Sequence, residues 1–267
     1  MNFLVTGGSG YLGSHLLNFL RDKNYNVVNI DTNTNSKFNT LKLNILDIDK
    51  IKDVFVNNKI DVVIHNTAKV PITKNKKNFY DTNVIGTKNI LEVSKKYNVK
   101  KFVYISSSAV YGIPNTLPIT EETQKIPVEP YGESKKIAEE ECFKNYENLS
   151  ISIIRPRTII GKNRFGIFSV LFDWISRGYN VPVLKNGENL YQFIDIEDLT
   201  DAIFKSIFVT ESGDFNIGAD DYFSIRELLQ KLINKNKSSS KIKDISGSKI
   251  LKLANLLQKI NLIPLHD

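Results

Sequence analysis

Short apolar runs alternate with amphipathic stretches along the first two-thirds of the chain. The apolar runs have the length of strands buried on both faces, and the amphipathic stretches repeat apolar residues with the period of a helix. This alternation is typical of parallel strands joined by helical crossovers, which cover both faces of the sheet. It predicts strands at residues 2–6, 26–31, 40–44, 61–65, 101–106 and 151–155, and helices at 10–22, 47–57, 79–97 and 130–146.

The hydrophobic rhythm changes after Arg155. A helix at 166–177 is followed by short strands at 181–184 and 191–194, a helix at 197–209, a strand at 214–217 and a helix at 224–234. The six earlier strands and their crossovers predict an α/β fold with a Rossmann-type doubly wound parallel sheet. We therefore expect a Rossmann domain at 1–160 and a smaller region at 161–267, partly packed back on the sheet.

The C-terminal stretch has two parts of different character. Residues 234–248 are polar and rich in lysine and serine, which predicts a mobile loop. Residues 249–263 place Ile250, Leu253, Leu257 and Ile260 at helical spacing. We expect an amphipathic helix that packs on its own domain rather than on a membrane surface.

Composition excludes disordered, collagen-like and membrane-bundle proteins. Of the 267 residues, 41% are hydrophobic and 24% are charged, which is the balance of a globular protein. No apolar run approaches the ~18–20 residues of a membrane-spanning helix, and the first residues lack the features of a secretory signal. Cys142 is the only cysteine, which excludes an internal disulfide. We expect no membrane span and a reducing, cytoplasmic location.

The net charge of +7 raises the question of nucleic-acid binding. The chain has 36 lysines and arginines against 29 aspartates and glutamates. Only six of the 36 are arginine, the side chain best suited to two-pronged recognition of phosphate. We therefore interpret the excess lysine as solvated surface and expect no nucleic-acid partner.

Glycines recur at the junction of the first predicted strand and helix. Gly7, Gly10 and Gly13 have the spacing G-x-x-G-x-x-G, and Tyr11 and Leu12 lie between the last two. A glycine permits a positive φ at the turn, another lets the backbone approach a pyrophosphate, and a third lets the helix pack close to the strand. A tight turn without a ligand is the alternative, but the strand-to-helix context favours a dinucleotide site.

Asp31 ends the second predicted strand, 18 residues after Gly13. A carboxylate there can accept hydrogen bonds from both hydroxyls of the adenosine ribose and would repel a 2′-phosphate. It therefore favours NAD over NADP, although Lys37 is close enough in sequence to weaken this preference. The alternative role of Asp31 is to cap the loop that follows.

Tyr131 and Lys135 lie one turn apart at the start of a predicted helix. The ammonium group of Lys135 would stabilise the phenolate and lower the pKa of Tyr131, which makes a base usable near neutral pH. Three serines, at 106–108, follow the fifth predicted strand, at the sheet edge where doubly wound folds bind ligands. One of these hydroxyls could hold a substrate oxygen beside Tyr131. The alternative is a serine-rich turn.

These motifs together resemble the extended short-chain dehydrogenases/reductases, specifically the NAD-dependent epimerase/dehydratase family that acts on nucleotide sugars. The resemblance covers about residues 1–200. It rests on TGGSGYLGSHLL at 6–17, VIHNTA at 63–68, NVIGTKNILE at 83–92, ISSSAVYG at 105–112, PYGESK at 130–135 and RPRTIIG at 155–161. It makes 1–160 the NAD-binding domain and 161–267 the substrate-binding region, which ends sooner than in relatives.

The resemblance implies a role for each matching residue. Tyr131 would be the acid/base, Lys135 would lower its pKa and bind the nicotinamide ribose, and Ser107 would hold the reacting oxygen. Ser107 is chosen because it lies four residues before Tyr111. The remaining cofactor contacts implied by the family are Asn44 and Ile45 for adenine, Asn66, Thr67 and Ala68 for ribose and phosphates, Asn83, and Pro156 near the nicotinamide.

Departures from the family pattern bear on the substrate. Dehydratases of the group have an acidic pair directly after the catalytic hydroxyl, whereas Ser108 and Ala109 follow Ser107 here, which disfavours dehydration. Thr158 replaces the usual asparagine as a substrate-binding residue. Residues 191–192 are Tyr-Gln where epimerases often have Arg-Asp, whose arginine helps hold a diphosphate. Arg157 and Arg164 are candidate substitutes, of which we select Arg164 for the substrate site.

We therefore predict an NAD-dependent epimerase of a nucleotide sugar. Tyr131 would take a proton from a ring hydroxyl while NAD accepts hydride, a keto intermediate would turn over, and hydride would return to its opposite face. The first alternative is an NAD(P)-dependent reductase or dehydrogenase of a keto-sugar or another hydroxy or keto substrate. The second is a non-catalytic dinucleotide sensor or RNA-binding relative.

The three histidines are too scattered in sequence for a metal site, so we predict no metal. The family resemblance implies a homodimer.

Overall fold

The computed structural model describes residues 1–34, 38–71, 79–164 and 166–245, which form two compact units. Among the described residues, the first unit contains those of Met1–Val70, Asn75–Arg157 and Ile196–Ile217. The second contains Pro71–Lys74, Thr158–Asp195 and Gly218–Asp267. The predicted helix at 249–263 and Lys37 lie outside the described residues.

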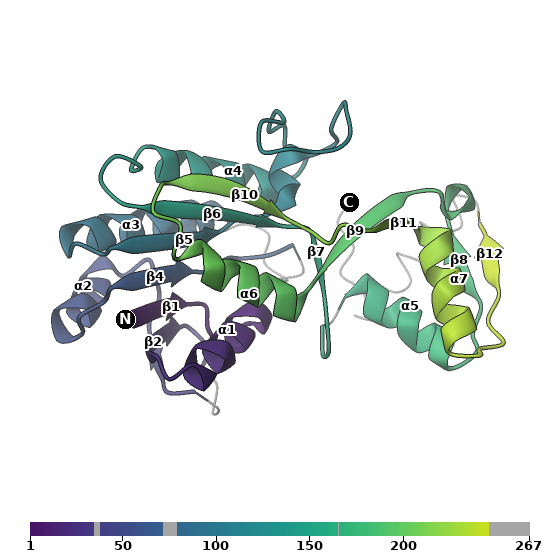
Figure 1. Ribbon diagram of the computed structural model, residues 1–267, viewed down its shortest axis with the longest axis horizontal. Coiled ribbons are helices and arrows are strands. Elements are labelled where there is room, and N and C mark those ends of the chain that lie inside the picture. The colour runs from purple at the N-terminus through teal and green to yellow at the C-terminus, as the bar shows by residue number, and fades with distance from the viewer. Residues whose placement is uncertain (35–37, 72–78, 165, 246–267) are drawn as a thin grey trace. The chain divides into compact units, whose positions relative to one another are not determined.

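A seven-stranded sheet organises the first unit, in the order β10-β6-β5-β4-β1-β2-β3 (Figure 1). Every neighbouring pair in it is parallel. Its strands are β1 (Asn2–Thr6), β2 (Asn26–Asp31), β3 (Thr40–Lys42), β4 (Val62–His65), β5 (Lys101–Ile105), β6 (Ile151–Pro156) and β10 (Gly213–Ile217). The predicted doubly wound Rossmann fold is confirmed.

Helices of the first unit cover both faces of this sheet. α1 (Tyr11–Asp22) packs against α6 (Ile196–Ser206), whereas α2 (Ile48–Asn57), α3 (Gly86–Lys96) and α4 (Pro130–Phe143) pack in a row on the other side (Figure 1). The predicted long helix at 79–97 contains a π-helical turn, η2 (Asp81–Ile85), directly before α3. Strands β4 and β5 are buried along their whole length, as parallel strands covered on both faces must be.

The two units are not continuous in sequence. Residues 161–267 are expected to form a smaller region that is partly packed back on the sheet; in the structure the chain returns to the first unit at Ile196–Ile217, where it forms α6 and β10. β10 pairs with β6 from Gly213↔Ser152 to Ile217↔Pro156 and is a seventh strand of the main sheet. Hydrophobic period identifies this helix and strand but does not reveal which sheet a strand joins.

The second unit is built from short elements. Strands β7 (Thr158–Ile160), β9 (Leu190–Asp195) and β11 (Tyr222–Ser224) form one sheet, and β8 (Val181–Val183) and β12 (Ile242–Asp244) form another. Helices α5 (Ile167–Ser176) and α7 (Ile225–Lys235) complete it. The predicted mobile loop at 234–248 is wrong at 242–244, because β12 pairs in parallel with β8 at Ile242↔Val181.

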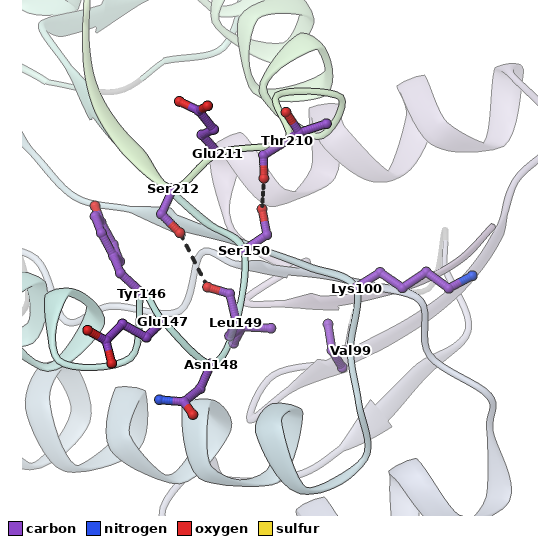
Figure 2. Close-up of a pocket in the computed structure, with 10 residues that line it drawn as sticks. All are labelled: Val99, Lys100, Tyr146, Glu147, Asn148, Leu149, Ser150, Thr210, Glu211 and Ser212. Atoms are coloured by element: carbon purple, nitrogen blue, oxygen red, sulfur yellow. Dashed lines mark hydrogen bonds between the residues drawn. The ribbon is translucent and has the colours of Figure 1, made fainter.

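The two edges of the seven-stranded sheet differ in function. Its amino-terminal edge has an open hollow of about 550 Å³, lined among others by Lys100, Tyr146, Ser150 and Ser212 (Figure 2). Ligands of doubly wound sheets bind at the opposite, carboxyl edge. The hollow therefore has no part in the site considered below. Among the described residues, no helix has both the length and the apolar character to cross a membrane.

Candidate active site

Parallel pairing brings the predicted motifs to one edge of the sheet. β1, β4, β5 and β6 are adjacent, and the register pairs Thr6 with His65, His65 with Tyr104, and Ile105 with Ile154. The segments that follow these strands therefore begin side by side. They hold the glycine turn, the loop at 66–69, the serines at 106–108, and Arg157.

Backbone conformation and close backbone contacts require glycine at two positions of the glycine turn. Gly7 has φ +72°, and a Cβ there would lie 2.9 Å from the backbone of Thr67. A Cβ on Gly13 would clash with the carbonyl oxygen of Gly7. The turn thus packs against the loop after β4 on one side and holds α1 against itself on the other.

The same region has hydrogen-bonding groups that fit a dinucleotide. α1 begins after Gly10, which provides no side-chain cap, so the first-turn N–H groups are not capped by that residue. The Oγ1 atom of Thr67 is buried, and no described residue hydrogen-bonds to it. Asn66 Nδ2 donates to Gly7 O at 3.1 Å, which holds this loop against the turn. Tyr11 lies in the first turn of α1, and Leu12 is buried beneath it.

Asp31 lies at the end of β2 beside the glycine turn. Its Oδ2 accepts a hydrogen bond from Ser9 N at 3.0 Å, and its Oδ1 accepts one from Asn33 N at 2.9 Å. The carboxylate is thus held in place by backbone N–H groups, as the capping alternative requires. A carboxylate has about four lone-pair sites, so these two bonds leave acceptor capacity for ribose hydroxyls.

The two residues predicted to contact adenine already have contacts within the protein. The Oδ1 atom of Asn44 accepts from Leu46 N at 3.0 Å. Ile45 is buried against Gly86 of α3, and its carbonyl oxygen accepts from Asn89 Nδ2 at 3.0 Å. Asn44 remains exposed and Ile45 does not, so only the first presents its side chain to solvent.

Close packing joins the segment of Ser107 to the start of α4. A Cβ on Gly132 would lie 2.6 Å from the carbonyl oxygen of Ala109, so this glycine lets α4 contact the 3₁₀ turn η3 (Ser108–Tyr111) directly. Ser107 caps η3, and its Oγ accepts from Ala109 N at 3.2 Å. Tyr131, directly before Gly132, has its ring edge-on to Phe79 at 6.2 Å. The predicted Ser107 and Tyr131 thus belong to two segments in contact.

Lys135 is buried beneath this contact, with 2% of its surface exposed. Its Nζ donates to Ile105 O at 2.7 Å and lies 4.6 Å from the centre of the Tyr104 ring. Burial lowers the pKa of Lys135 to about 7, while the charge of Glu139 acts in the opposite direction.

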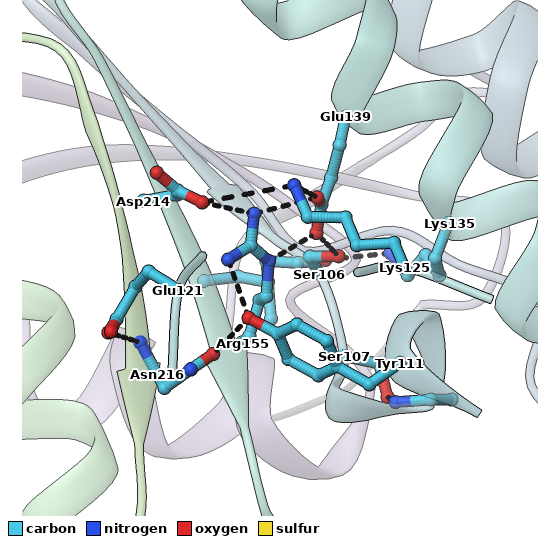
Figure 3. Close-up of polar contacts among 12 residues, drawn as sticks. Ser106, Ser107, Tyr111, Glu121, Lys125, Lys135, Glu139, Arg155, Asp214 and Asn216 are labelled. Carbon is cyan, nitrogen blue, oxygen red and sulfur yellow. Dashed lines mark hydrogen bonds and ion pairs between the residues drawn. The ribbon is translucent and has the colours of Figure 1, made fainter. Parts of the chain in front are cut away.

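A buried ionic network lies one helical turn further along α4 (Figure 3). Arg155 Nε donates to Glu139 Oε1 at 2.8 Å and Nη2 donates to Oε2 at 2.9 Å, and both side chains are fully buried. Arg155 Nη1 also donates to the Tyr111 hydroxyl at 2.8 Å, and its guanidinium pairs with Asp214 of β10. Ser106 Oγ donates to Glu139 Oε1 at 2.5 Å. The network thereby links α4, which carries Lys135, to β6, to β10 and to η3, which Ser107 caps.

A second network runs from the loop after β4 to α4, with His65 at its centre. Thr87 Oγ1 donates to Asn83 O at 2.7 Å, so at 3.0 Å it must accept from His65 Nε2–H. His65 Nδ1 then accepts from the hydroxyl of Thr6 at 2.7 Å. Burial, together with the charge of Lys135, lowers the pKa of His65 to about 3, which keeps it neutral.

The side chain of Asn83 continues this second network to the helix of Tyr131. Asn83 Oδ1 accepts from Lys69 N at 2.8 Å, and Nδ2 donates to Ser134 Oγ at 2.9 Å. Ser134 Oγ donates in turn to the carbonyl oxygen of Tyr131 at 2.7 Å. The predicted Asn83 therefore connects the loop at 66–69 to the first turn of α4.

The remaining predicted residues are divided between the units. Pro156 is the last residue of β6 and is buried. Thr158 and Arg164 belong to the second unit, where Thr158 is exposed and pairs with Phe193 across β7 and β9. Arg164 N donates to Gly161 O at 3.2 Å, and its side chain has contacts of its own. Within the described ranges, no three side chains of the metal-ligand type gather.

Sequence reasoning missed the parts of the site that depend on long-range contacts. The motifs exclude a metal role for His65 and assign no role to Glu139, Arg155, Thr87 or Ser134. One signal was available: Glu139 lies one turn after Lys135 and shares its helix face. Its partner Arg155 lies on another strand, so the pair itself could not be found.

Known proteins are similar to this chain in sequence and in fold. A family model described as the NAD dependent epimerase/dehydratase family matches residues 3–218. The uncharacterized protein y4nG of Sinorhizobium fredii is 39% identical over 98% of this chain and 67% of its own length. A putative UDP-glucose 4-epimerase of Methanocaldococcus jannaschii is 32% identical, over 84% of this chain and 79% of its own length.

A solved structure extends this similarity to three dimensions. The UDP-glucose 4-epimerase of Thermotoga maritima, solved with UDP-glucose, has a TM-score of 0.81 and 25% identity, covering 92% of this chain and 87% of its own. The resemblance stated from the motifs is thus confirmed, as is NAD as the cofactor. The chain is an enzyme and belongs to the NAD dependent epimerase/dehydratase family.

Proposed function

We propose that this enzyme epimerises a nucleotide sugar, with Tyr131 as its acid/base. The observation that carries the proposal is the close packing of Gly132 on Ala109, which joins the segment of Ser107 to the first turn of the helix of Tyr131 and Lys135. Both segments belong to the carboxyl edge of the sheet, beside the glycine turn. The relatives named as UDP-glucose 4-epimerases support the same substrate class.

Each of the three side chains has a separate task in this proposal. Tyr131 takes the proton of a ring hydroxyl, and Ser107 donates a hydrogen bond to the same oxygen. Lys135, fixed by Ile105 O, favours the phenolate of Tyr131 through its positive charge. Bound NAD supplies the acceptor for hydride from the sugar carbon and the donor that returns it. The turn at Gly7–Gly13, Asp31 and the loop at 66–68 hold that cofactor.

The residues after Ser107 favour epimerisation over dehydration. Elimination of water needs an additional acid and base near the reacting carbon. Ser108 and Ala109 form the first half of η3, and neither carries a carboxylate. Glu139 of α4 is fully buried between Arg155 and Ser106 and cannot serve.

A reductase or dehydrogenase with net redox change is the second candidate. It is favoured by Gln192, which replaces the aspartate often present in epimerases and whose Nε2 donates to Ala219 O at 2.6 Å within the second unit. The non-catalytic alternative is set aside, because the family consists of enzymes. Homodimerisation and a cytoplasmic location stay predictions from the sequence.

The variant Tyr131→Phe tests the proposal. It removes the hydroxyl that carries the proton, so kcat for epimerisation should fall by about 10²–10⁴-fold while NAD stays bound. Turnover is measured on a panel of UDP- and dTDP-sugars by chromatography of the epimerised product, and bound NAD is measured after denaturation. Tyr179→Phe, at an exposed tyrosine of the second unit, is the matched control and should retain full activity.

Two results would decide against the proposal. Full activity of Tyr131→Phe would remove Tyr131 from the mechanism. Wild-type protein that consumes added NADH or NADPH in proportion to product would favour the reductase, because an epimerase regenerates its cofactor in every cycle.

A further inference from the structure

Arg157 lies directly beyond β6 at the carboxyl edge of the sheet, and its side chain is half-buried. Its backbone N–H donates to Ile217 O at 2.8 Å, which fixes the residue beside the end of β10. Its Nε atom is buried and has no hydrogen-bond acceptor in the part of the chain that the structure describes. Within the same ranges its guanidinium forms no ion pair.

Arg155, two residues earlier, shows what a structural arginine looks like in this fold. Its guanidinium donates to Glu139 and Tyr111 and pairs with Asp214. Burial alone would lower the pKa of Arg155, but these partners outweigh burial and raise it. At Arg157 burial lowers the pKa, and no partner compensates for it. Guanidinium keeps its charge in proteins, so the buried Nε–H of Arg157 requires an acceptor from elsewhere.

Three acids near β6 and β10 are already engaged. Glu139 and Asp214 are held by Arg155 and by Lys125, whose Nζ lies 3.0 Å from Glu139 Oε2 and 3.9 Å from Asp214 Oδ2 (Figure 3). Glu121 Oε1 accepts from Asn216 N at 2.7 Å. None of these three carboxylates forms a hydrogen bond or ion pair with Arg157 in the described structure.

We propose that Arg157 binds an oxyanion of the substrate. The inference rests on the proposed function, because it places the substrate at the carboxyl edge of the sheet. A planar guanidinium binds phosphate or carboxylate through two parallel hydrogen bonds, and Nε supplies one donor of such a pair. The orphaned Nε–H is the donor that this ligand would satisfy.

Two groups of a nucleotide sugar have this chemistry. One is the diphosphate of a UDP- or dTDP-sugar. The other is the carboxylate of a uronic acid, which only some sugars carry. Comparison of uridine, UDP, UDP-glucose and UDP-glucuronate separates them, because the first two steps of this series add the diphosphate and the sugar, and the last replaces the hydroxymethyl group of the sugar by a carboxylate.

Arginine Nε–H signals in an NMR spectrum provide a direct test. The chain has six arginines, so protein labelled with ¹⁵N-arginine and loaded with NAD gives a simple spectrum, in which the variant Arg157→Lys identifies the signal of Arg157. A shift of that signal with UDP but not with uridine assigns the diphosphate. A shift that requires UDP-glucuronate assigns the carboxylate. No shift with any of the four ligands overturns the proposal.

Binding measurements on variants complete the test. Arg157→Gln should weaken the ligand that shifts the signal by about tenfold to a hundredfold, and Arg157→Lys should lie between Gln and wild type. Arg177→Gln, at an exposed arginine paired with Asp173 on α5, makes the same charge change and should bind as wild type does. Wild-type affinity in Arg157→Gln would overturn the proposal.

Turnover of the wild type is measured in parallel, so that two failures can be told apart. Epimerised product without a shift of the Arg157 signal contradicts only the role of Arg157. A shift without product contradicts only the proposed function.

Discussion

His65 is a buried histidine that the surrounding hydrogen bonds hold in one protonation state. Thr6 donates to Nδ1, and Thr87 accepts from Nε2–H because its own hydrogen is donated to Asn83 O. A second proton on the ring would have to displace the hydrogen of Thr6. The neutral ring with its proton on Nε2 is therefore the form of His65 that these hydrogen bonds fit.

The lowered pKa of His65 predicts a loss of stability in acid. In the unfolded chain the group titrates near 6.5, whereas in the folded protein its pKa is about 3, so between these values the unfolded state binds more protons. This contribution is fully present above pH 6.5 and is lost as the pH falls, at about 1.4 kcal/mol per pH unit. From pH 6.5 to 4.5 the loss is about 2 kcal/mol, because the unfolded group is only half protonated at pH 6.5.

Urea unfolding of wild type and His65→Gln between pH 7.5 and 4.5 measures this contribution, because only the wild type carries the group. The pH dependence of the free energy of unfolding should be shallower in the variant. Histidine ¹⁵N spectra should show His65 neutral and protonated on Nε2 at pH 5. Equal pH slopes for the two proteins, or a His65 that titrates near pH 6 in the folded state, would contradict the assignment.

At this scale the sequence predicted residues whose chemistry is local. Gly7 and Gly13 were predicted from spacing, and the clashes that a Cβ would make there confirm the need for glycine. The roles of Tyr131, Lys135 and Ser107 stay predictions. His65 could not be assigned, because its partners lie 59 and 22 residues away and only strand pairing and helix packing bring them together.

The Glu139–Arg155 pair links helix α4 to strand β6, and through Asp214 and Tyr111 it reaches β10 and η3. Two fully buried charges are stable only when they are paired. We expect Glu139→Ala to lower the free energy of unfolding by about 3–5 kcal/mol, because Arg155 then keeps only part of its compensation. The double variant Glu139→Leu/Arg155→Met should lose less than the sum of the single variants, since it leaves no unpaired charge.

Chemical denaturation of Glu139→Leu, Arg155→Met and the double variant tests this coupling. Lys205→Gln, at an exposed i,i+4 pair with Asp201 on α6, is the control and should change stability by less than about 0.5 kcal/mol. A double variant whose loss equals the sum of its single losses would show that the two side chains act independently.

The bounds of strands were predicted best where the strand has five or six residues. The bounds of β1 and β2 match the predicted 2–6 and 26–31. Among the three-residue strands, β3 and β8 were predicted within 40–44 and 181–184, whereas β7, β11 and β12 were missed, because three residues seldom show an alternation. Polar Ile242–Asp244 forms a strand because β8 supplies the pairing partner, which no local pattern reveals.

The first unit as a whole depends on a segment that lies between two parts of the second unit in sequence. Residues 196–217 provide β10, which pairs with β6, and α6, whose Phe204 packs against Phe19 of α1 at 5.3 Å between ring centres. They also provide Asp214, a partner of the buried Arg155. A division of the chain at residue 160 separates all of these contacts from the sheet that needs them.

Two fragments test this dependence. The fragment 1–160 should lack a cooperative thermal transition, because it exposes the face of α1 that α6 covers and leaves Arg155 without Asp214. A second fragment joins 1–157 to 196–217 through a Gly/Ser linker of about 15 residues, whose average reach of roughly 20 Å allows β10 to return to β6. It should unfold cooperatively by circular dichroism and retain NAD binding, since every residue assigned to the cofactor lies within 1–157. Cooperative unfolding of 1–160 alone would show that the sheet is complete without β10, and failure of both fragments would show that the first unit requires the second in order to fold.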